Sequence, residues 1–203
     1  MYTIFMNILI VTGNPKKENH TDIIKTTYKD TVEKSGHEVK LINVYAEEFS
    51  LPYSNPEKGS LDKESEEKIK KMQEMIMWAN EIVIIHPIWW ASMPAGLKNW
   101  ADTIFTPRFA YKYTTEGKVE KLLTGKTAKV FATAGSRALF YHIPIVSLFT
   151  PLRIIWKYAI LNFCGINLVE ILVQDKMNTN NSCPPVGCFE NFLEKIKVSA
   201  TRH

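Results

Sequence analysis

The sequence predicts an α/β protein with a doubly wound, five-stranded parallel sheet and helices on both faces. Short apolar runs rich in β-branched residues recur along the 203-residue chain, and segments with helical apolar spacing separate them. The length suits one domain with a substantial core, and no internal repeat or low-complexity linker divides it. We therefore expect residues 1–203 to form a single domain. Alternation of strands and helices favours the strand order 2-1-3-4-5.

Five apolar runs define the expected strands. The clearest is Ile82–Ile85, where consecutive apolar residues without polar alternation are typical of a strand covered on both faces. His86 and Pro87 should end this strand, because proline lacks an amide donor and restricts the residue before it. The expected strands are Met6–Thr12, Glu38–Tyr45, Ile82–Ile85, Thr127–Ala132 and Ile166–Val173.

Helical spacing of apolar residues defines the segments between the strands. Gly36 should end the first helix and Gly165 the fourth, because glycine adopts the left-handed conformation found just after helix ends. Residues Thr114–Leu123 are polar and are expected to form a loop. The expected helices are Asp22–Lys34, Asp62–Ala79, a segment following Pro94, part of Pro144–Phe163, and Cys188–Val198.

Composition narrows the function classes. The net charge of +4 is small, and lysines alternate with glutamates in residues 57–71, whereas a nucleic-acid binder would cluster its basic residues. Cys183 and Cys188 have no second cysteine pair and no neighbouring histidine, so no metal site is expected. Translation could begin at Met1 or Met6; the apolar start is expected to be a strand, not a signal peptide. Charged residues interrupt the longest apolar stretch, so we expect a soluble cytoplasmic protein.

Three loops should meet at one ligand site. In an open parallel sheet of this order, the loops after strands 1, 3 and 4 converge where the strand order reverses. The first loop ends in Asn19, His20 and Thr21 at the start of a helix, where free backbone N–H groups suit a phosphate. The alternative is ordinary helix capping by Asn19 or Thr21.

Two adjacent tryptophans follow the third strand, in the second of these loops. Aromatic side chains often fill a core, but Trp89 and Trp90 cannot easily both point inward from a strand-to-helix loop. The physical alternatives are therefore core packing and a platform for a planar ligand.

The segment HPIWWASMPAGLKNWADTIFTPRFAYKY, residues 86–113, resembles the central segment of the flavodoxin-like NAD(P)H:quinone oxidoreductases. The shared features are a proline, a short aromatic loop, Pro-Ala, Leu-Lys-x-Trp and Phe-Ala-Tyr-x-Tyr. The resemblance implies a flavodoxin-like fold and a bound flavin, which would be FMN or, as the alternative, FAD. It also implies NAD(P)H as co-substrate and ping-pong hydride transfer to a quinone or a similar electron-poor aromatic.

The resemblance also assigns residues to the expected site. The loop after the third strand should lie along the flavin ring with Trp90 as an aromatic wall, and a small-residue loop after the fourth strand should approach it. Tyr141 and His142 should stabilise negative charge on the reduced ring. The implied cofactor-binding residues are Asn14, Asn19, His20, Thr21, Pro87, Ile88, Trp89, Trp90, Ala91, Thr133, Ala134, Gly135, Ser136 and Tyr141.

The family also suggests a shared site between two subunits. Tyr111, Tyr113 and Phe163 match aromatic positions that line the partner subunit's pocket, so a homodimer with two shared sites is expected. Two alternatives stay open: a nitro- or azo-reductase, and an ancillary flavoprotein of a membrane transporter. The sequence does not choose between NADH and NADPH or name the physiological acceptor.

Overall fold

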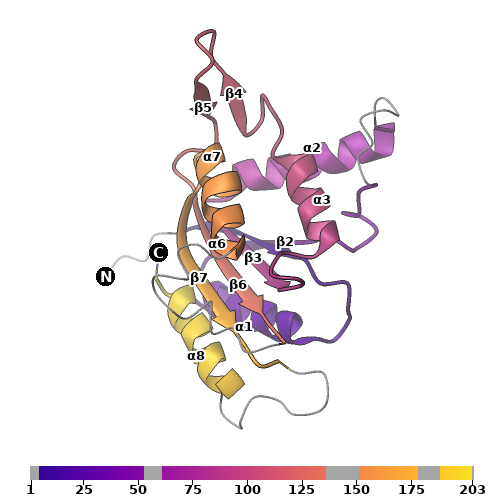
Figure 1. Ribbon diagram of the computed structural model, residues 1–203. Coiled ribbons are helices and arrows are strands. Elements are labelled where there is room, and N and C mark those ends of the chain that lie inside the picture. Colours follow the sequence, from indigo (N-terminus) through magenta and orange to yellow (C-terminus); the bar gives the residue numbers. More distant parts are fainter. Residues whose placement is uncertain (1–4, 53–60, 136–150, 178–187, 203) are drawn as a thin grey trace.

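A computed structural model describes residues 5–52, 61–135, 151–177 and 188–202. Its centre is a five-stranded parallel sheet in the order β2-β1-β3-β6-β7 (Figure 1). In chain order these are the second, first, third, fourth and fifth long strands, so the predicted doubly wound order is confirmed. The strands are β1 (Asn7–Thr12), β2 (Glu38–Asn43), β3 (Glu81–Pro87), β6 (Thr127–Thr133) and β7 (Asn167–Gln174).

Helices cover both faces of the sheet, as Figure 1 shows. On one face, α1 (His20–Lys34) and α8 (Cys188–Ala200) lie side by side against β1, β3 and β6. The other face carries α2 (Lys63–Trp78), α3 (Ala95–Ile104) and a continuous helical segment. That segment consists of α6 (Pro151–Arg153), the π-helical η2 (Ile154–Leu161) and α7 (Asn162–Cys164). In the described ranges, no helix is both long and apolar enough to cross a bilayer.

The central strand β3 contributes to both cores, because alternate side chains point to opposite faces. Val83 and Ile85 pack with α1 and α8, whereas Ile82 and Ile84 pack with the helices of the other face. All residues of β3 are buried, which explains the apolar run without polar alternation.

The third strand does end at Pro87, as expected, but it is longer than the expected Ile82–Ile85. Both His86 and Pro87 belong to β3, where Pro87 pairs in register with Thr133 of β6. Pro87 has no N–H, but the next residue, Ile88, donates its N–H to the Thr133 carbonyl at 2.7 Å. The proline is tolerated because pairing resumes at the following amide.

Capping residues set the helix boundaries. Helix α1 begins at His20, two residues earlier than expected, because Asn19 is its N-cap. Asp62 caps α2 through the Ser65 amide at 2.7 Å. The predicted glycine after the fourth helix is confirmed: Gly165 follows α7 with a φ of +98°, in the left-handed region that favours glycine.

A small antiparallel hairpin projects from the body of the molecule (Figure 1). It consists of β4 (Tyr111–Tyr113) and β5 (Val119–Lys121). The expectation of a loop over Thr114–Leu123 is therefore wrong for β5. Residues of β5 are all exposed, so the segment has no apolar alternation that could have indicated a strand.

Candidate functional site

A cavity of about 290 Å³ lies at the carboxyl edge of the sheet. The loops after β1, β3 and β6 form it together with one residue beyond β7. In a sheet of this order, that is the point where the strand order reverses and where ligands bind. The lining residues are Asn14, Lys16, Asn19, His20, Thr21, Pro87, Ile88, Trp89, Thr133, Ala134, Gly135 and Met177.

Most of the residues predicted for the site line this one cavity. Two lining residues, Lys16 and Met177, were not among the predicted site residues. Met177 reaches the cavity because its N–H donates to the Ala134 carbonyl at 2.9 Å. This contact joins residues far apart in the sequence, so no local pattern could have indicated it. Predicted residues Ser136, Tyr141 and His142 lie outside the described residues.

The first loop is closed by an asparagine cap. The Asn19 side-chain oxygen accepts the Thr21 amide at 2.8 Å and the Asp22 amide at 3.3 Å. The Asp22 carboxylate in turn accepts the Asn19 N–H at 3.4 Å, which completes a capping box. The capping interpretation of Asn19 is therefore confirmed, and these two first-turn amides are already used.

Asn14 and His20 complete this side of the cavity. Asn14 donates from Nδ2 to the Thr21 hydroxyl at 3.1 Å and accepts the Lys16 N–H at 3.1 Å, which orders the loop. The His20 ring packs edge-on against Phe189 of α8, with ring centroids 5.1 Å apart. Partial burial lowers the pKa of His20 below its usual value, which favours the neutral ring.

The loop after β3 forms a tight turn. Trp89 and Ser92 exchange both N–H···O bonds, each at 2.9 Å. Trp90 and Ala91 between them have φ of +49° and +60°, the left-handed pair of a type I′ turn. Neither residue belongs among those that line the cavity, and the Trp90 side chain is fully exposed. The expected aromatic wall is therefore not formed by Trp90 within one chain; Trp89, which is itself exposed, lines the cavity instead.

Free backbone donors remain around the cavity. In the described part of the chain, the amides of Trp90, Ala91 and Gly135 donate to no protein acceptor. The amides of Ile88 and Trp89, in contrast, donate to the Thr133 and Ser92 carbonyls. The turn after β3 and the loop after β6 therefore keep N–H groups available for a ligand with acceptor atoms along its edge.

The three aromatics predicted for a shared pocket do not line this cavity. Tyr111, at the base of the hairpin, meets Phe163 of α7 with ring centroids 4.8 Å apart and Tyr113 at 5.8 Å. Helix α3 runs back along the sheet from the loop after β3, so the hairpin that follows it lies away from the carboxyl edge (Figure 1). Tyr113 is mostly exposed there.

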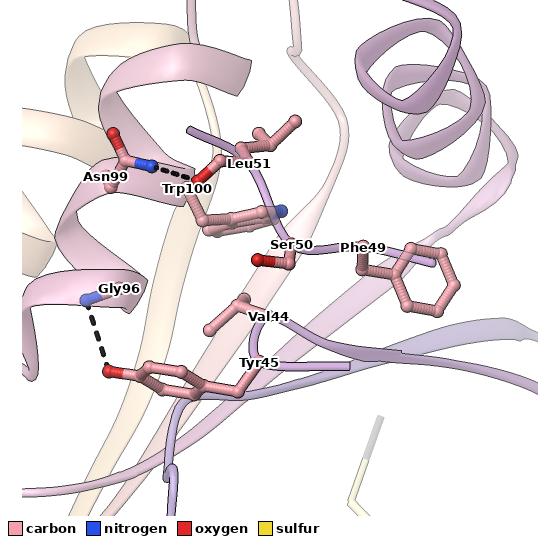
Figure 2. A pocket seen from close by; sticks show the side chains of 8 residues that line it. All are labelled: Val44, Tyr45, Phe49, Ser50, Leu51, Gly96, Asn99 and Trp100. Carbon is pink, nitrogen blue, oxygen red and sulfur yellow. Dashed lines mark hydrogen bonds between the residues drawn. The ribbon is translucent and has the colours of Figure 1, made fainter. Parts of the chain in front are cut away.

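A smaller cavity of about 130 Å³ lies beside the end of β2 (Figure 2). The Tyr45 hydroxyl accepts the Gly96 N–H at 3.1 Å, and Asn99 Nδ2 donates to the Leu51 carbonyl at 3.2 Å. Trp100 Nε1 lacks a hydrogen-bond partner among the described residues. None of the predicted site residues lines this cavity, and most of its polar groups already serve the fold. The cavity at the carboxyl edge is therefore the candidate site.

Fold and site together define a class of protein, the doubly wound sheets that bind a ligand at the reversal of strand order. The family model for the flavodoxin-like fold matches residues 6–184, so this chain belongs to the flavodoxin-like fold family.

Known proteins resemble the chain in sequence and in fold. It is 35% identical over 101 residues to the FMN-dependent NADH:quinone oxidoreductase of Thiobacillus denitrificans, covering 50% of this chain and 46% of that protein. The chain spans about half the length of the curated relatives it matches.

Solved structures cover nearly the whole chain. The NAD(P)H:quinone oxidoreductase from Methanothermobacter marburgensis has a TM-score of 0.78 at 20% identity, covering 98% of this chain and 99% of that one. An FMN-dependent NADH-azoreductase from Bacillus anthracis, solved with FMN, has a TM-score of 0.76 at 19% identity, with coverage of 98% and 99%. At these identities the likeness shows the shared fold.

Proposed function

We propose that this protein is an FMN-dependent NAD(P)H oxidoreductase that reduces quinones or similar electron-poor aromatics. The observation that carries the proposal is that three separate loops meet around one cavity at the reversal of strand order. The relative from Thiobacillus denitrificans is an FMN-dependent NADH:quinone oxidoreductase by name, which supports the same proposal.

The residues at the cavity suit a flavin mononucleotide. The Lys16 ammonium and the His20 amide suit its phosphate, because the first-turn amides of Thr21 and Asp22 are already used by the Asn19 cap. The free amide of Gly135, which lines the cavity, and those of Trp90 and Ala91 in the adjoining turn suit the acceptor atoms along the ring edge.

Apolar and aromatic groups complete the fit, since Pro87, Ile88 and Met177 supply apolar surface and Trp89 an aromatic ring. The flavin, when bound, supplies hydride acceptance and donation; the chain supplies orientation, charge complementarity and exclusion of water. NAD(P)H and the acceptor would use the same cavity in turn, which gives ping-pong kinetics. We also propose that Tyr141 and His142 stabilise negative charge on the reduced flavin ring.

We also propose a two-fold dimer whose subunits complete each other's cavity. Support comes from exposed aromatics that are unusual on a monomer surface: Trp90 is fully exposed and Tyr113 is 62% exposed. The hairpin that carries Tyr111 and Tyr113 projects from the body, so it is free to reach a second copy (Figure 1). A cavity of about 290 Å³ is at the small end for a cofactor site, which agrees with a roof contributed by another subunit.

Steady-state kinetics tests the enzyme proposal. FMN-loaded protein should oxidise NADH or NADPH continuously when a quinone is present, and double-reciprocal plots at several quinone concentrations should be parallel. Bound flavin without turnover on any quinone would contradict the proposal and favour a carrier or ancillary role.

An azo dye should be assayed beside the quinone. The similar structure from Bacillus anthracis is named an azoreductase, which gives a specific reason to include this acceptor. If turnover on azo dyes far exceeds turnover on quinones, azo reduction is the principal activity.

A further inference from the structure

A fully buried histidine lies directly behind the floor of the cofactor cavity. His86, the next-to-last residue of β3, has no exposed surface. Among the described residues its ring has two polar contacts: Nε2 lies 3.0 Å from Nε1 of Trp156, and Nδ1 lies 2.8 Å from the carbonyl oxygen of Pro87.

These contacts fix the tautomer of His86. An indole Nε1–H only donates hydrogen bonds, so Nε2 of His86 must be the acceptor and carries no proton. The proton of the neutral ring is therefore on Nδ1, which donates to the Pro87 carbonyl. Burial lowers the pKa of His86 to about 4, so the ring stays neutral near pH 7.

The peptide between Pro87 and Ile88 is consequently held at both polar atoms. Its carbonyl oxygen accepts from His86, and its N–H donates to the Thr133 carbonyl at 2.7 Å. Pro87, Ile88 and Thr133 all line the cavity, and the turn of Trp90 and Ala91 with its free amides starts directly after this peptide. A rotation of this peptide would move the floor of the cavity and the turn together.

We propose that His86, in its Nδ1–H tautomer, is a positioning residue that fixes the Pro87–Ile88 peptide for flavin binding, with Trp156 of η2 selecting that tautomer. The inference rests on the proposed function, because it takes the cavity to be the flavin site. A merely structural core histidine would affect stability alone; a positioning residue also affects the geometry and affinity of the bound flavin.

Two substitutions separate the two contacts of the ring. The amide of asparagine occupies the place of Nδ1 and keeps a donor for Pro87, whereas the amide of glutamine reaches the place of Nε2 and keeps an acceptor for Trp156. Tyr28→Phe is the matched control, since it removes a buried hydrogen bond to Glu81 on the opposite face of the sheet, away from the cavity.

The test is a titration of flavin-free protein with FMN, in which flavin fluorescence reports the affinity. The visible circular dichroism of the bound ring reports its geometry, and a thermal melt reports the stability of each variant. His86→Gln should weaken FMN binding about tenfold and alter the dichroism, because loss of one hydrogen bond shifts an equilibrium by about this factor. His86→Asn should stay within about threefold of wild type. Tyr28→Phe should lower the melting temperature without changing either flavin signal.

The outcomes are distinguishable. Wild-type protein that binds neither FMN nor FAD would sink the proposed function. Two results would overturn only the positioning role, provided that the wild-type protein binds FMN. In the first, the two His86 variants bind FMN with the same affinity as each other. In the second, the losses of FMN affinity follow the melting temperatures of all three variants. Imidazole ¹⁵N NMR of wild-type protein, assigned with His86→Asn, tests the tautomer even where His86→Gln does not fold: a proton on Nε2 would overturn the inference.

Discussion

The two ends of β3 both bury a titratable side chain, but they stabilise it in opposite ways. At the start of the strand, Glu81 pairs with Lys129 at 3.0 Å and accepts the Tyr28 hydroxyl at 2.5 Å. At the end, His86 is neutral and is held by Trp156 and Pro87. Glu81 faces the helices α1 and α8, and His86 faces the helix η2.

The difference follows from what each end does. Lys129 also donates to the carbonyls of Ser199 and Arg202 at 2.8 and 2.9 Å, so the charged cluster anchors the end of α8 to the sheet. The neutral histidine instead orders a single peptide at the edge of a cavity. A charged group behind that cavity would shift the pKa of a bound ligand, whereas a neutral ring orients the peptide without such a shift.

Breaking the charged pair should give the largest effect. Lys129→Met removes the cation that lies 3.0 Å from the buried Glu81 carboxylate, so the free energy of unfolding should fall by about 3–5 kcal/mol. The exposed pair of Lys98 and Asp102 provides the control, because Lys98→Met should cost about 0.5 kcal/mol or less. Urea unfolding measures both, and similar losses for the two variants would contradict the importance of burial.

Low pH should reduce the stability of the folded protein through His86, at the end of β3. Unfolded His86 takes up a proton below pH 6.5, whereas the folded state resists protonation until about pH 4. Stability is therefore lost as the pH falls through this window, by about 3 kcal/mol in all. Between pH 7 and pH 5, the stability advantage of wild type over His86→Gln should shrink by about 2 kcal/mol in urea unfolding. A constant difference across these pH values would show that His86 does not resist protonation.

The cap beside the cavity gives a smaller effect. Asn19→Ala removes an acceptor for two amides of α1 and should lower the free energy of unfolding by about 1 kcal/mol. Ser35→Ala, at the exposed far end of the same helix, should change it by less than about 0.5 kcal/mol. Chemical denaturation distinguishes them; an unchanged Asn19→Ala variant would argue against the cap.

The turn after β3 should give the smallest effect. Because Trp90 has a φ of +49°, Trp90→Gly should be more stable than Trp90→Ala by about 0.5–1 kcal/mol. Both variants remove the exposed ring, so both should weaken a dimer that uses this ring. Analytical ultracentrifugation measures the dissociation of the dimer. A more stable alanine variant would show that the turn is not left-handed.

The sequence predicted the sheet order and most of the cavity for local reasons. Apolar runs such as Ile82–Ile85 mark buried strands, and in a parallel sheet the loops after them must share one edge. The features that the sequence did not predict depend on contacts between residues far apart in the chain. Met177 enters the cavity through Ala134, and the partner of His86 is Trp156, seventy residues away. The orientation of Trp90 depends on backbone angles that no apolar pattern records.

The most direct test of the account is the visible absorption spectrum of the purified protein, followed by mass analysis of the small molecule released on denaturation. A flavin spectrum and released FMN would support the cavity formed by the loops after β1, β3 and β6 as the cofactor site. A preparation that is colourless and stays so after incubation with FMN and with FAD would contradict it.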